Sequence, residues 1–239
     1  MNSFNFQSIG IIHSCYTEKF GIPRQSGLVT AAPATLELHA PYDCPEALVE
    51  LQGFSHIWVV FVFHQAIRDN WKPTVRPPRL GGNQRIGVFA SRSPFRPNPI
   101  GMSAVMLEDI QCRNGHCQLK LRGGDFLDGT PVLDIKPYLP YADILPDARG
   151  GFAAQSPENE MTVVFDALAT EQCEVWERTK YPGLRQLIEQ VLQADPRPAY
   201  YVGRENKQSF GMCLYDVDVR WIVHGNKAEV IALLLKNKK

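Results

Sequence analysis

The chain carries its apolar residues in short runs, which are separated by polar, glycine-rich and proline-rich stretches. The runs cover residues 8–12, 35–40, 57–63, 102–112, 117–121, 131–135 and 161–165. Residues 35–40 alternate apolar and polar positions, which indicates a strand with one buried face, whereas residues 57–63 (IWVVFVF) are apolar throughout, which is typical of a strand covered on both faces. Asn114-Gly115 separates two of the runs and predicts a tight hairpin turn.

The connections between these strands are too short for crossover helices. A doubly wound parallel sheet is therefore excluded, and the pattern predicts a mainly β fold, a single-sheet barrel or curled sheet, which residues 161–165 are expected to close. A short helix is expected to begin at Pro45. Residues 70–82 form a proline-rich excursion, too irregular for a hairpin, and such long loops are usually functional or mobile.

The pattern changes after Asp166. Residues 171–194 have apolar residues at helical spacing, and Asp195-Pro196 ends this predicted helix. Residues 210–223 and 228–235 are the strands of a predicted long hairpin. We therefore expect a barrel domain over residues 1–166 and a small α+β appendage over residues 167–239.

The cysteines and the apolar runs indicate the cellular compartment in which the protein is expected to work. The six cysteines show no CxxC spacing, so we expect free thiols in a reducing cytoplasm. The first residues lack the basic and apolar regions of a signal peptide, and the longest apolar run is too short to cross a bilayer. These features predict a cytoplasmic protein.

The formal net charge is zero, but the charges are unevenly distributed. Residues 68–107 contain one acid, Asp69, and seven basic residues: Arg68, Lys72, Arg76, Arg79, Arg85, Arg92 and Arg96. Trp71 and Phe95 are interleaved with them. Such a local basic patch suits an anionic partner even on a neutral protein, and a solvated basic face is the alternative.

Residues 87–101, GVFASRSPFRPNPIG, contain three prolines that fix their own φ and disfavour helical conformations before them. The sequence therefore predicts a stiff, extended loop that presents Arg92 and Arg96. Guanidinium groups held in this way suit a carboxylate or phosphate. Ion pairs with acids of the same chain are the structural alternative.

Common catalytic signatures are absent from the chain. It contains no GxGxxG after a strand, no P-loop, no GxSxG and no HExxH. The histidines are scattered, and Cys112, His116 and Cys117 at a hairpin tip are a weak indication of a metal site. We expect no metal.

Polar residues cluster instead in four loops at strand ends: residues 23–25, 64–65, 92–96 and 128–138. If these loops converge, they form a cleft for a small ligand that carries both charges. Each also has a structural interpretation, since Asp128 suits a turn that bonds its own backbone, and Asp134 can pair with Lys136.

Three of these segments resemble a known family. SRSPFRPNPIG (residues 91–101), LDGTPVLDIKPYLPYAD (residues 127–143) and GIPRQSGLV (residues 21–29) are similar to the motifs of the TsaA-like proteins, and the similarity to the bacterial tRNA methyltransferases of this family extends to QADPRPAY near the end. The resemblance implies an S-adenosylmethionine-dependent β-barrel enzyme, a homodimer, that methylates the exocyclic nitrogen of threonylcarbamoyl-modified adenosine 37 in the tRNA anticodon stem-loop. A binding regulator without turnover is the alternative.

The resemblance also implies site residues. The cofactor is expected near a dimer interface, among Pro23, Arg24, Gln25, His64, Gln65, Arg92, Leu127, Asp128, Gly129 and Thr130. The acceptor nitrogen is a poor nucleophile until it loses its proton, so a base is chemically useful. Asp134 and Tyr138 are the candidates, and Asp128 stays open as a third.

The appendage contains a second proline-stiffened arginine. Arg197 stands between Pro196 and Pro198, with Tyr200 beyond them. A rigid Arg beside an aromatic ring suits a splayed RNA base. A helix stop followed by an edge strand is the alternative. We expect the appendage to be dispensable for cofactor binding but needed for tRNA.

Overall fold

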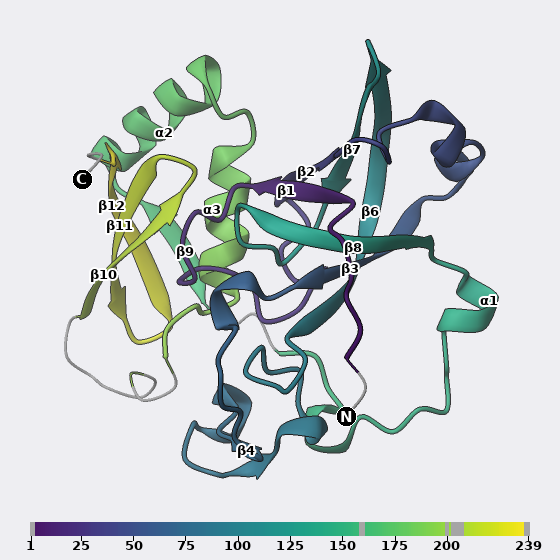
Figure 1. Ribbon diagram of the computed structural model, residues 1–239. Coiled ribbons are helices and arrows are strands. Elements are labelled where there is room, and N and C mark those ends of the chain that lie inside the picture. Colours follow the sequence, from purple (N-terminus) through teal and green to yellow (C-terminus); the bar gives the residue numbers. More distant parts are fainter. Residues whose placement is uncertain (1–2, 158–160, 199–200, 202–207, 237–239) are drawn as a thin grey trace.

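The computed structural model describes residues 3–157, 161–198, 201 and 208–236 and shows two sheets side by side (Figure 1). The first is a closed barrel of antiparallel neighbours in the order β1-β2-β7-β6-β3-β8. Its strands are β1 (Gly10–Ser14), β2 (Pro33–Leu38), β3 (His56–Val62), β6 (Ile100–Arg113), β7 (His116–Arg122) and β8 (Thr130–Pro137). The prediction of a mainly β, single-sheet barrel is confirmed.

The barrel has one core, so its strands bury only one face. Along β3, Ile57, Val59 and Phe61 are buried, while the residues between them are half-buried on the outside. The prediction that β3 is covered on both faces is therefore wrong, because no second layer lies over the outer face of the barrel in the described part of the chain. Its outer apolar residues remain partly exposed.

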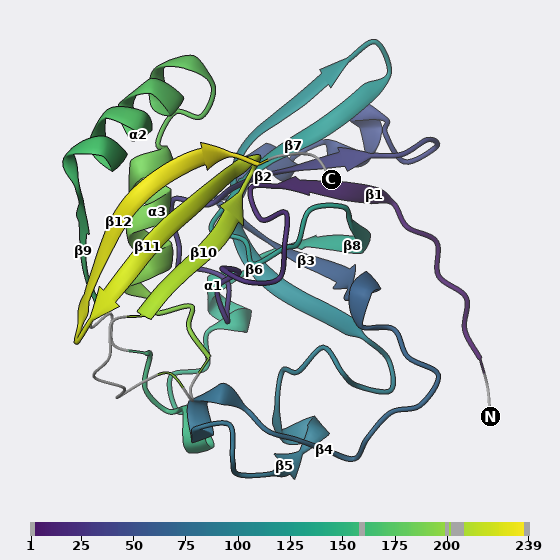
Figure 2. The same ribbon diagram turned by 90° about the vertical axis from the view of Figure 1, so that its left-hand side faces the viewer.

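Short elements occupy the loops of the barrel. These are the 3-10 turns η1 (Pro45–Leu48), η2 (Leu51–Gly53), η3 (His64–Ala66), η4 (Pro78–Leu80), η5 (Val88–Ala90) and η6 (Gly151–Ala153), the strands β4 (Thr74–Val75) and β5 (Ile86–Gly87), and the helix α1 (Pro140–Asp143). The proline-rich excursion contains β4, which pairs with β5 beyond its end, and the two strands project from the barrel (Figure 2).

The second sheet has the order β10-β11-β12-β9. Its strands are β9 (Thr162–Phe165), β10 (Gln208–Leu214), β11 (Val217–His224) and β12 (Lys227–Leu235), and the helices α2 (Ala167–Thr179) and α3 (Leu184–Gln193) pack against it. β9 runs parallel to β12. The expectation that residues 161–165 close the barrel is therefore wrong, since the barrel closes through β1 and β8.

Two further expectations about this region are corrected. The single helix predicted over residues 171–194 is two helices, because Pro182-Gly183 interrupts it and Gly183 adopts a positive φ of 81°. The predicted strand over residues 210–223 is divided by a turn at Tyr215 and Asp216, which makes three strands of the expected hairpin.

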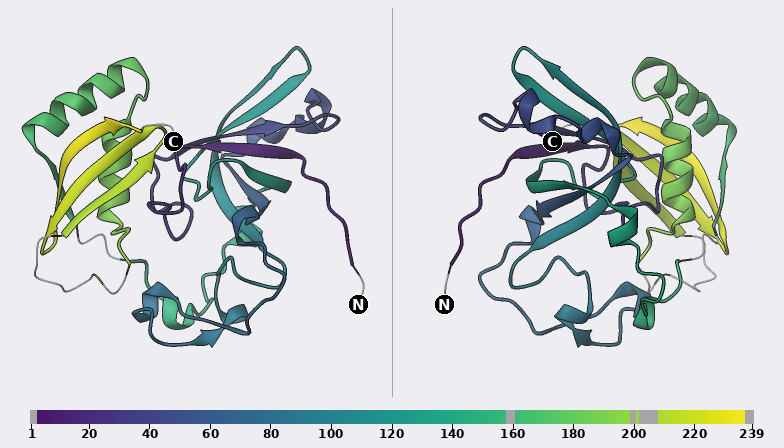
Figure 3. Two further views of the ribbon diagram at one scale, coloured as in Figure 1. Left: turned by 60° about the vertical axis from the view of Figure 1, so that its left-hand side comes forward. Right: turned by 90° about the vertical axis from the view of Figure 1, so that its right-hand side faces the viewer.

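The second sheet shares a hydrophobic core with the loops that follow β1 and precede β2, and this core is separate from that of the barrel. Cys15, Tyr16, Val29, Ala31 and Ala32 of the N-terminal segment pack with buried residues of α3 and the second sheet. The helix α3 lies between the sheets (Figure 1). Figure 3 shows the same arrangement from two further sides. The C-terminal part is thus an integral layer of the molecule.

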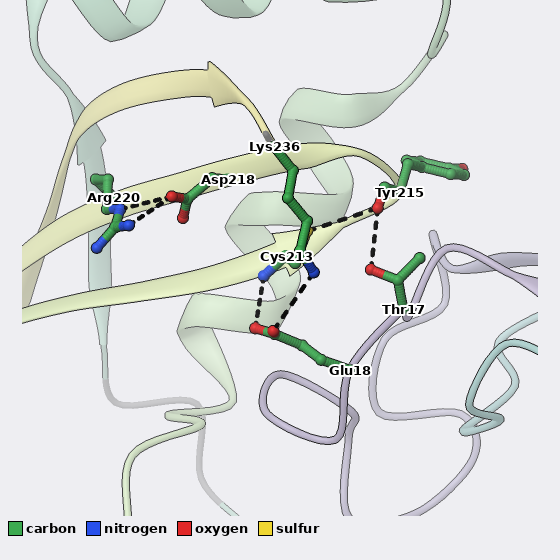
Figure 4. A network of polar contacts seen from close by, with 7 residues as sticks. All are labelled: Thr17, Glu18, Cys213, Tyr215, Asp218, Arg220 and Lys236. Atoms are coloured by element: carbon green, nitrogen blue, oxygen red, sulfur yellow. Dashed lines mark hydrogen bonds and ion pairs between the residues drawn. The ribbon is translucent and has the colours of Figure 1, made fainter. Parts of the chain in front are cut away.

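Polar contacts reinforce this junction (Figure 4). The Thr17 hydroxyl donates to the Tyr215 carbonyl at 2.9 Å, and Glu18 accepts from the Cys213 amide at 2.8 Å. Lys236 lies 3.9 Å from the other Glu18 oxygen. These contacts tie the appendage to the N-terminal segment, and its dispensability for cofactor binding stays a prediction.

The β6–β7 hairpin turns at Asn114-Gly115, as predicted, with φ of 52° and 78°. Cys112 and Cys117 face each other across this hairpin and form a disulfide. The expectation of six free thiols is therefore wrong for these two, because strand register rather than sequence spacing brings them together. None of the helices in the described part of the chain has the length and apolar character needed to span a bilayer.

Candidate functional site

The proline-stiffened loop meets the N-terminal loop through its first arginine. Arg92 Nη1 donates to Gln25 Oε1 at 2.6 Å and so joins two segments 67 residues apart. Arg92 is exposed, whereas Arg96 is half-buried and donates to the Ser91 carbonyl at 3.2 Å. The loop therefore uses Arg96 to brace itself and leaves the Arg92 guanidinium accessible to a ligand.

Gln25 and Arg92 line a cleft with a volume of about 2340 Å³. Its walls come from the N-terminal loop, the excursion around β4 and β5, residues 150–157, and residues 194–197 and 225–226 of the C-terminal part. Arg79 donates to the Gln155 carbonyl and links two of these walls. A small-molecule pocket typically occupies roughly 300–1,000 Å³, so the cleft has room for a macromolecular segment as well as a cofactor.

The lining of the cleft is strongly basic. Among the described residues that line it, one is acidic, Asp195, and nine are basic: Arg24, Arg68, Lys72, Arg76, Arg79, Arg85, Arg92, Arg96 and Arg197. All seven basic residues of the sequence patch are among them. The folded chain thus gathers charges that are spread over the sequence into one surface suited to an anionic partner.

Asp125 lies close enough to Arg92 to be affected by its charge, and it was missed by sequence reasoning. It accepts a hydrogen bond of 2.6 Å from the buried Ser103 hydroxyl. Burial raises the pKa of Asp125 above its ordinary value, and the hydrogen bond from Ser103 and the charge of Arg92 oppose that rise. The only sequence signal was an acid next to the LDGT run, so the pairing with Ser103 required the structure.

The LDGT run, Leu127–Thr130, is a tight turn that enters β8. Asp128 Oδ1 accepts from the Ser14 amide at 2.9 Å, and the Thr130 hydroxyl donates to the Leu127 carbonyl at 2.6 Å. Gly129 has a φ of 76°, which favours glycine. The run is thus a turn, but Asp128 bonds the backbone of β1 rather than its own as the structural interpretation had it, and it remains exposed to solvent.

The other predicted cofactor residues lie around the N-terminal loop. Pro23 is buried and Arg24 is exposed at the cleft. His64 and Gln65 form η3 together with Ala66, and Ala66 lines the cleft. Lys19 donates to the Gln65 carbonyl at 3.1 Å and ties η3 to the N-terminal segment. The structure thus brings Arg24, Gln25 and Arg92 together, with η3 nearby.

The two predicted catalytic residues lie on the outer face of the barrel. Asp134 pairs with Lys136 at 2.8 Å, in the register row of Val60 and Met102. The Tyr138 ring contacts the Trp58 ring at a centroid distance of 5.6 Å. Neither residue is among those that line the cleft around Arg92.

Arg197 does not behave as the sequence suggested. It is 6% exposed, and its Nε donates to Asp195 Oδ1 at 2.7 Å. Its charge is therefore already paired, and the expectation of a free arginine for RNA phosphate is wrong. Tyr200, which was expected to stack a base beside it, lies outside the described residues. Within the described part of the chain, no group of three or more His, Cys, Asp or Glu side chains is arranged to hold a metal ion.

Comparisons with known proteins agree with this architecture. The family model described as the tRNA-methyltransferase O N-terminal domain matches residues 11–144, and the TrmO C-terminal domain matches residues 158–236. The chain is 52% identical to the tRNA (adenine(37)-N6)-methyltransferase of Escherichia coli (strain K12), over 98% of this chain and 99% of the relative. It is 48% identical to a putative S-adenosylmethionine-dependent methyltransferase, RcsF, of Pseudomonas aeruginosa, over 95% and 94% of the two chains. A crystal structure of TrmO from Pseudomonas aeruginosa superposes with a TM-score of 0.79 at 41% identity, covering 98% of this chain and 99% of that one.

Proposed function

We propose, from the premise that this chain belongs to the tRNA-methyltransferase O family, that its basic cleft brings S-adenosylmethionine and a tRNA anticodon loop together. The chain is an S-adenosylmethionine-dependent tRNA methyltransferase that acts on the exocyclic nitrogen of adenine 37. The finer proposal is that this adenosine carries a threonylcarbamoyl group. The observation that carries the proposal is the junction of Gln25 and Arg92 inside one basic cleft.

The residues at this junction fit the cofactor chemically. The exposed guanidinium of Arg92 suits a carboxylate, and the exposed carboxylate of Asp128 suits a cationic or hydroxyl group. We propose that Pro23, Arg24, Gln25, His64, Gln65, Arg92 and Leu127–Thr130 hold S-adenosylmethionine. When bound, S-adenosylmethionine supplies an electrophilic methyl group on a sulfonium. Since such a group needs little further activation, the protein contributes mainly position and exclusion of water.

The adenine nitrogen needs more help, because its lone pair is delocalised. A base that removes its proton raises its nucleophilicity. We propose Asp134 or Tyr138 for this role, with Asp128 as the alternative. Since Asp134 and Tyr138 lie on the outer face of the barrel, either one reaches an active site only if a second copy presents that face to the cleft.

A homodimer is therefore part of the proposal. The outer face of the barrel supports it, because Ile100, Met102 and Met106 of β6 are exposed beside half-buried Trp58 and Val60 of β3. Apolar side chains gathered on one face are typical of protein interfaces. Covering this face with a second copy would remove these side chains from water.

We also propose that residues 1–166 hold the cofactor and that residues 167–239 take part in tRNA recognition. Gly225 and Asn226, at the β11–β12 turn, support this division because they line the same cleft. We further propose that the protein works in the cytoplasm, where tRNA is modified.

Nucleoside mass spectrometry of tRNA from a strain that lacks the gene tests the proposal. The loss of one methyl group from threonylcarbamoyladenosine, restored by the gene, is the expected result. If saturable S-adenosylmethionine binding were found together with an unchanged nucleoside profile, the protein would be a regulator without turnover.

A further inference from the structure

Two aromatic side chains stand in the basic cleft with most of their surface in water. Trp71 is 51% exposed and Phe89 is 73% exposed, and both line the cleft. Their ring centroids are 6.3 Å apart and the planes are inclined by 35°. The two rings therefore form a contiguous aromatic surface that faces the space available to a ligand.

The backbone around these rings is fixed. Trp71 comes before β4, Phe89 follows β5, and the two strands pair through Thr74 with Gly87 and Val75 with Ile86. The Val88 amide donates to the Pro73 carbonyl at 2.9 Å, and Val88 itself is buried. Burial of Val88 sets the direction of its neighbour Phe89, which points outward. The aromatic pair is thus held by the pairing of β4 with β5 and by the buried Val88.

Other groups in the cleft show which ligand would suit this pair. Phe95 is 40% exposed, and the Arg68 guanidinium lies 4.1 Å from the centroid of its ring. Lys72 and Arg76, which flank the pair, are exposed. Rings that alternate with cations suit an unpaired nucleic-acid strand, whose bases stack while its phosphates meet the positive charges. An apolar protein segment would offer no anion to the exposed basic side chains of the cleft, such as Lys72 and Arg76.

We infer that Trp71 and Phe89 form a stacking platform for an unpaired base of the anticodon loop, a neighbour of the methylated adenosine. This inference rests on the proposed function. The methylated adenine itself has to lie near Gln25 and Arg92, which belong to other loops of the cleft. A flanking base stacked on Trp71 and Phe89 would help to keep the loop open and the target adenine out of its stack.

The fluorescence of Trp71 provides a direct test. The chain has four tryptophans, of which Trp221 is buried and Trp58 and Trp176 are half-buried. Titration with an unmodified anticodon stem-loop RNA should quench the fluorescence, and a fully paired RNA duplex of the same length should quench it much less. The Trp71→Phe variant should bind the stem-loop with similar affinity and lose most of the quenching. Equal quenching by both RNAs, or full quenching in Trp71→Phe, would overturn the inference.

Steady-state methyl transfer gives a second test. Trp71→Ala and Phe89→Ala should each raise the KM for tRNA roughly 10-fold, the effect expected from losing one stacked base, and leave S-adenosylmethionine binding unchanged. Phe6→Ala is the matched control, because Phe6 is 71% exposed and is not among the residues that line the cleft. If the wild type methylates tRNA, and Trp71→Ala and Phe89→Ala have the same KM for tRNA as the wild type, the stacking platform is refuted and the proposed function stands. If the wild type transfers no methyl group, the proposed function itself fails.

Discussion

Replacing Arg92 with alanine tests the proposed cofactor site. Arg92 is exposed, it is held by the bond to Gln25, and it stands on a loop stiffened by three prolines. Little side-chain entropy is therefore lost when it binds a ligand. A hydrogen bond to a charged group contributes about 1–3 kcal/mol. Since about 1.4 kcal/mol is a factor of ten in affinity, Arg92→Ala should raise the Kd for S-adenosylmethionine about 5- to 140-fold.

Isothermal titration calorimetry measures this change directly. Gln25→Ala should weaken binding less, because it loosens Arg92 without removing the charge, and the double variant should be no weaker than Arg92→Ala alone if the two act as one unit. Each variant should keep the thermal midpoint of the wild type, since Arg92 is exposed. An unchanged Kd in a folded Arg92→Ala protein would show that this guanidinium is structural and that the cofactor binds elsewhere.

Four further predictions concern the cleft and the fold. Replacing both Lys72 and Arg76 with alanine should make the plot of log Kd for RNA against log salt less steep by about 1.4, because two phosphates lose their contacts; an unchanged slope would place the RNA elsewhere. Asp125→Asn should raise the thermal midpoint at neutral pH, because it removes a carboxylate whose ionised form is disfavoured by burial. The gain should vanish below pH 3.8, the ordinary pKa of the carboxyl, where Asp125 is protonated in both the folded and the unfolded protein. A gain independent of pH would exclude ionisation as its cause. Trp221→Ala should lower the free energy of unfolding by about 3–5 kcal/mol in denaturant titrations, and a loss below 1 kcal/mol would contradict its place in the shared core. Thiol titration of the denatured protein should find four thiols before reduction and six after it, whereas six at the outset would rule out the β6–β7 disulfide.

The barrel could be predicted because its signals are local. Alternating runs, short connections and the Asn-Gly turn each depend on neighbouring residues. The position of β9 could not be predicted. The sequence of a four-residue strand does not indicate which strand it pairs with, and its partner β12 lies more than 60 residues away along the chain. The Cys112–Cys117 disulfide is local, since the two cysteines are 5 residues apart, but the strand register that places them opposite each other was not predicted.

The turn at Tyr215 shows a different limit. Tyrosine rarely adopts a φ of 56°, and no glycine or proline marks the position. The ring of Tyr215 stacks on Tyr181 at a centroid distance of 4.0 Å, and the Tyr181 hydroxyl donates to Asp216. Tertiary contacts thus stabilise a turn that the sequence does not signal.

For the site, the unusual composition of the loops predicted candidate residues, but it did not predict which residues surround them. The proline-stiffened loop correctly suggested an accessible Arg92. The same reasoning was wrong for Arg197, because its guanidinium is paired with the Asp195 carboxylate. Removing the residues after Asp166 would expose the core around Tyr16, so point variants are the better test of how cofactor binding and tRNA binding are divided.

Transfer of labelled methyl groups from S-adenosylmethionine to tRNA tests the central claim most directly. The purified protein should label tRNA that carries threonylcarbamoyladenosine, and digestion should place the label in that nucleoside at position 37. The same tRNA transcribed without modifications should accept far less. Saturable binding of S-adenosylmethionine and tRNA without any transfer, or label in another nucleoside, would contradict the account.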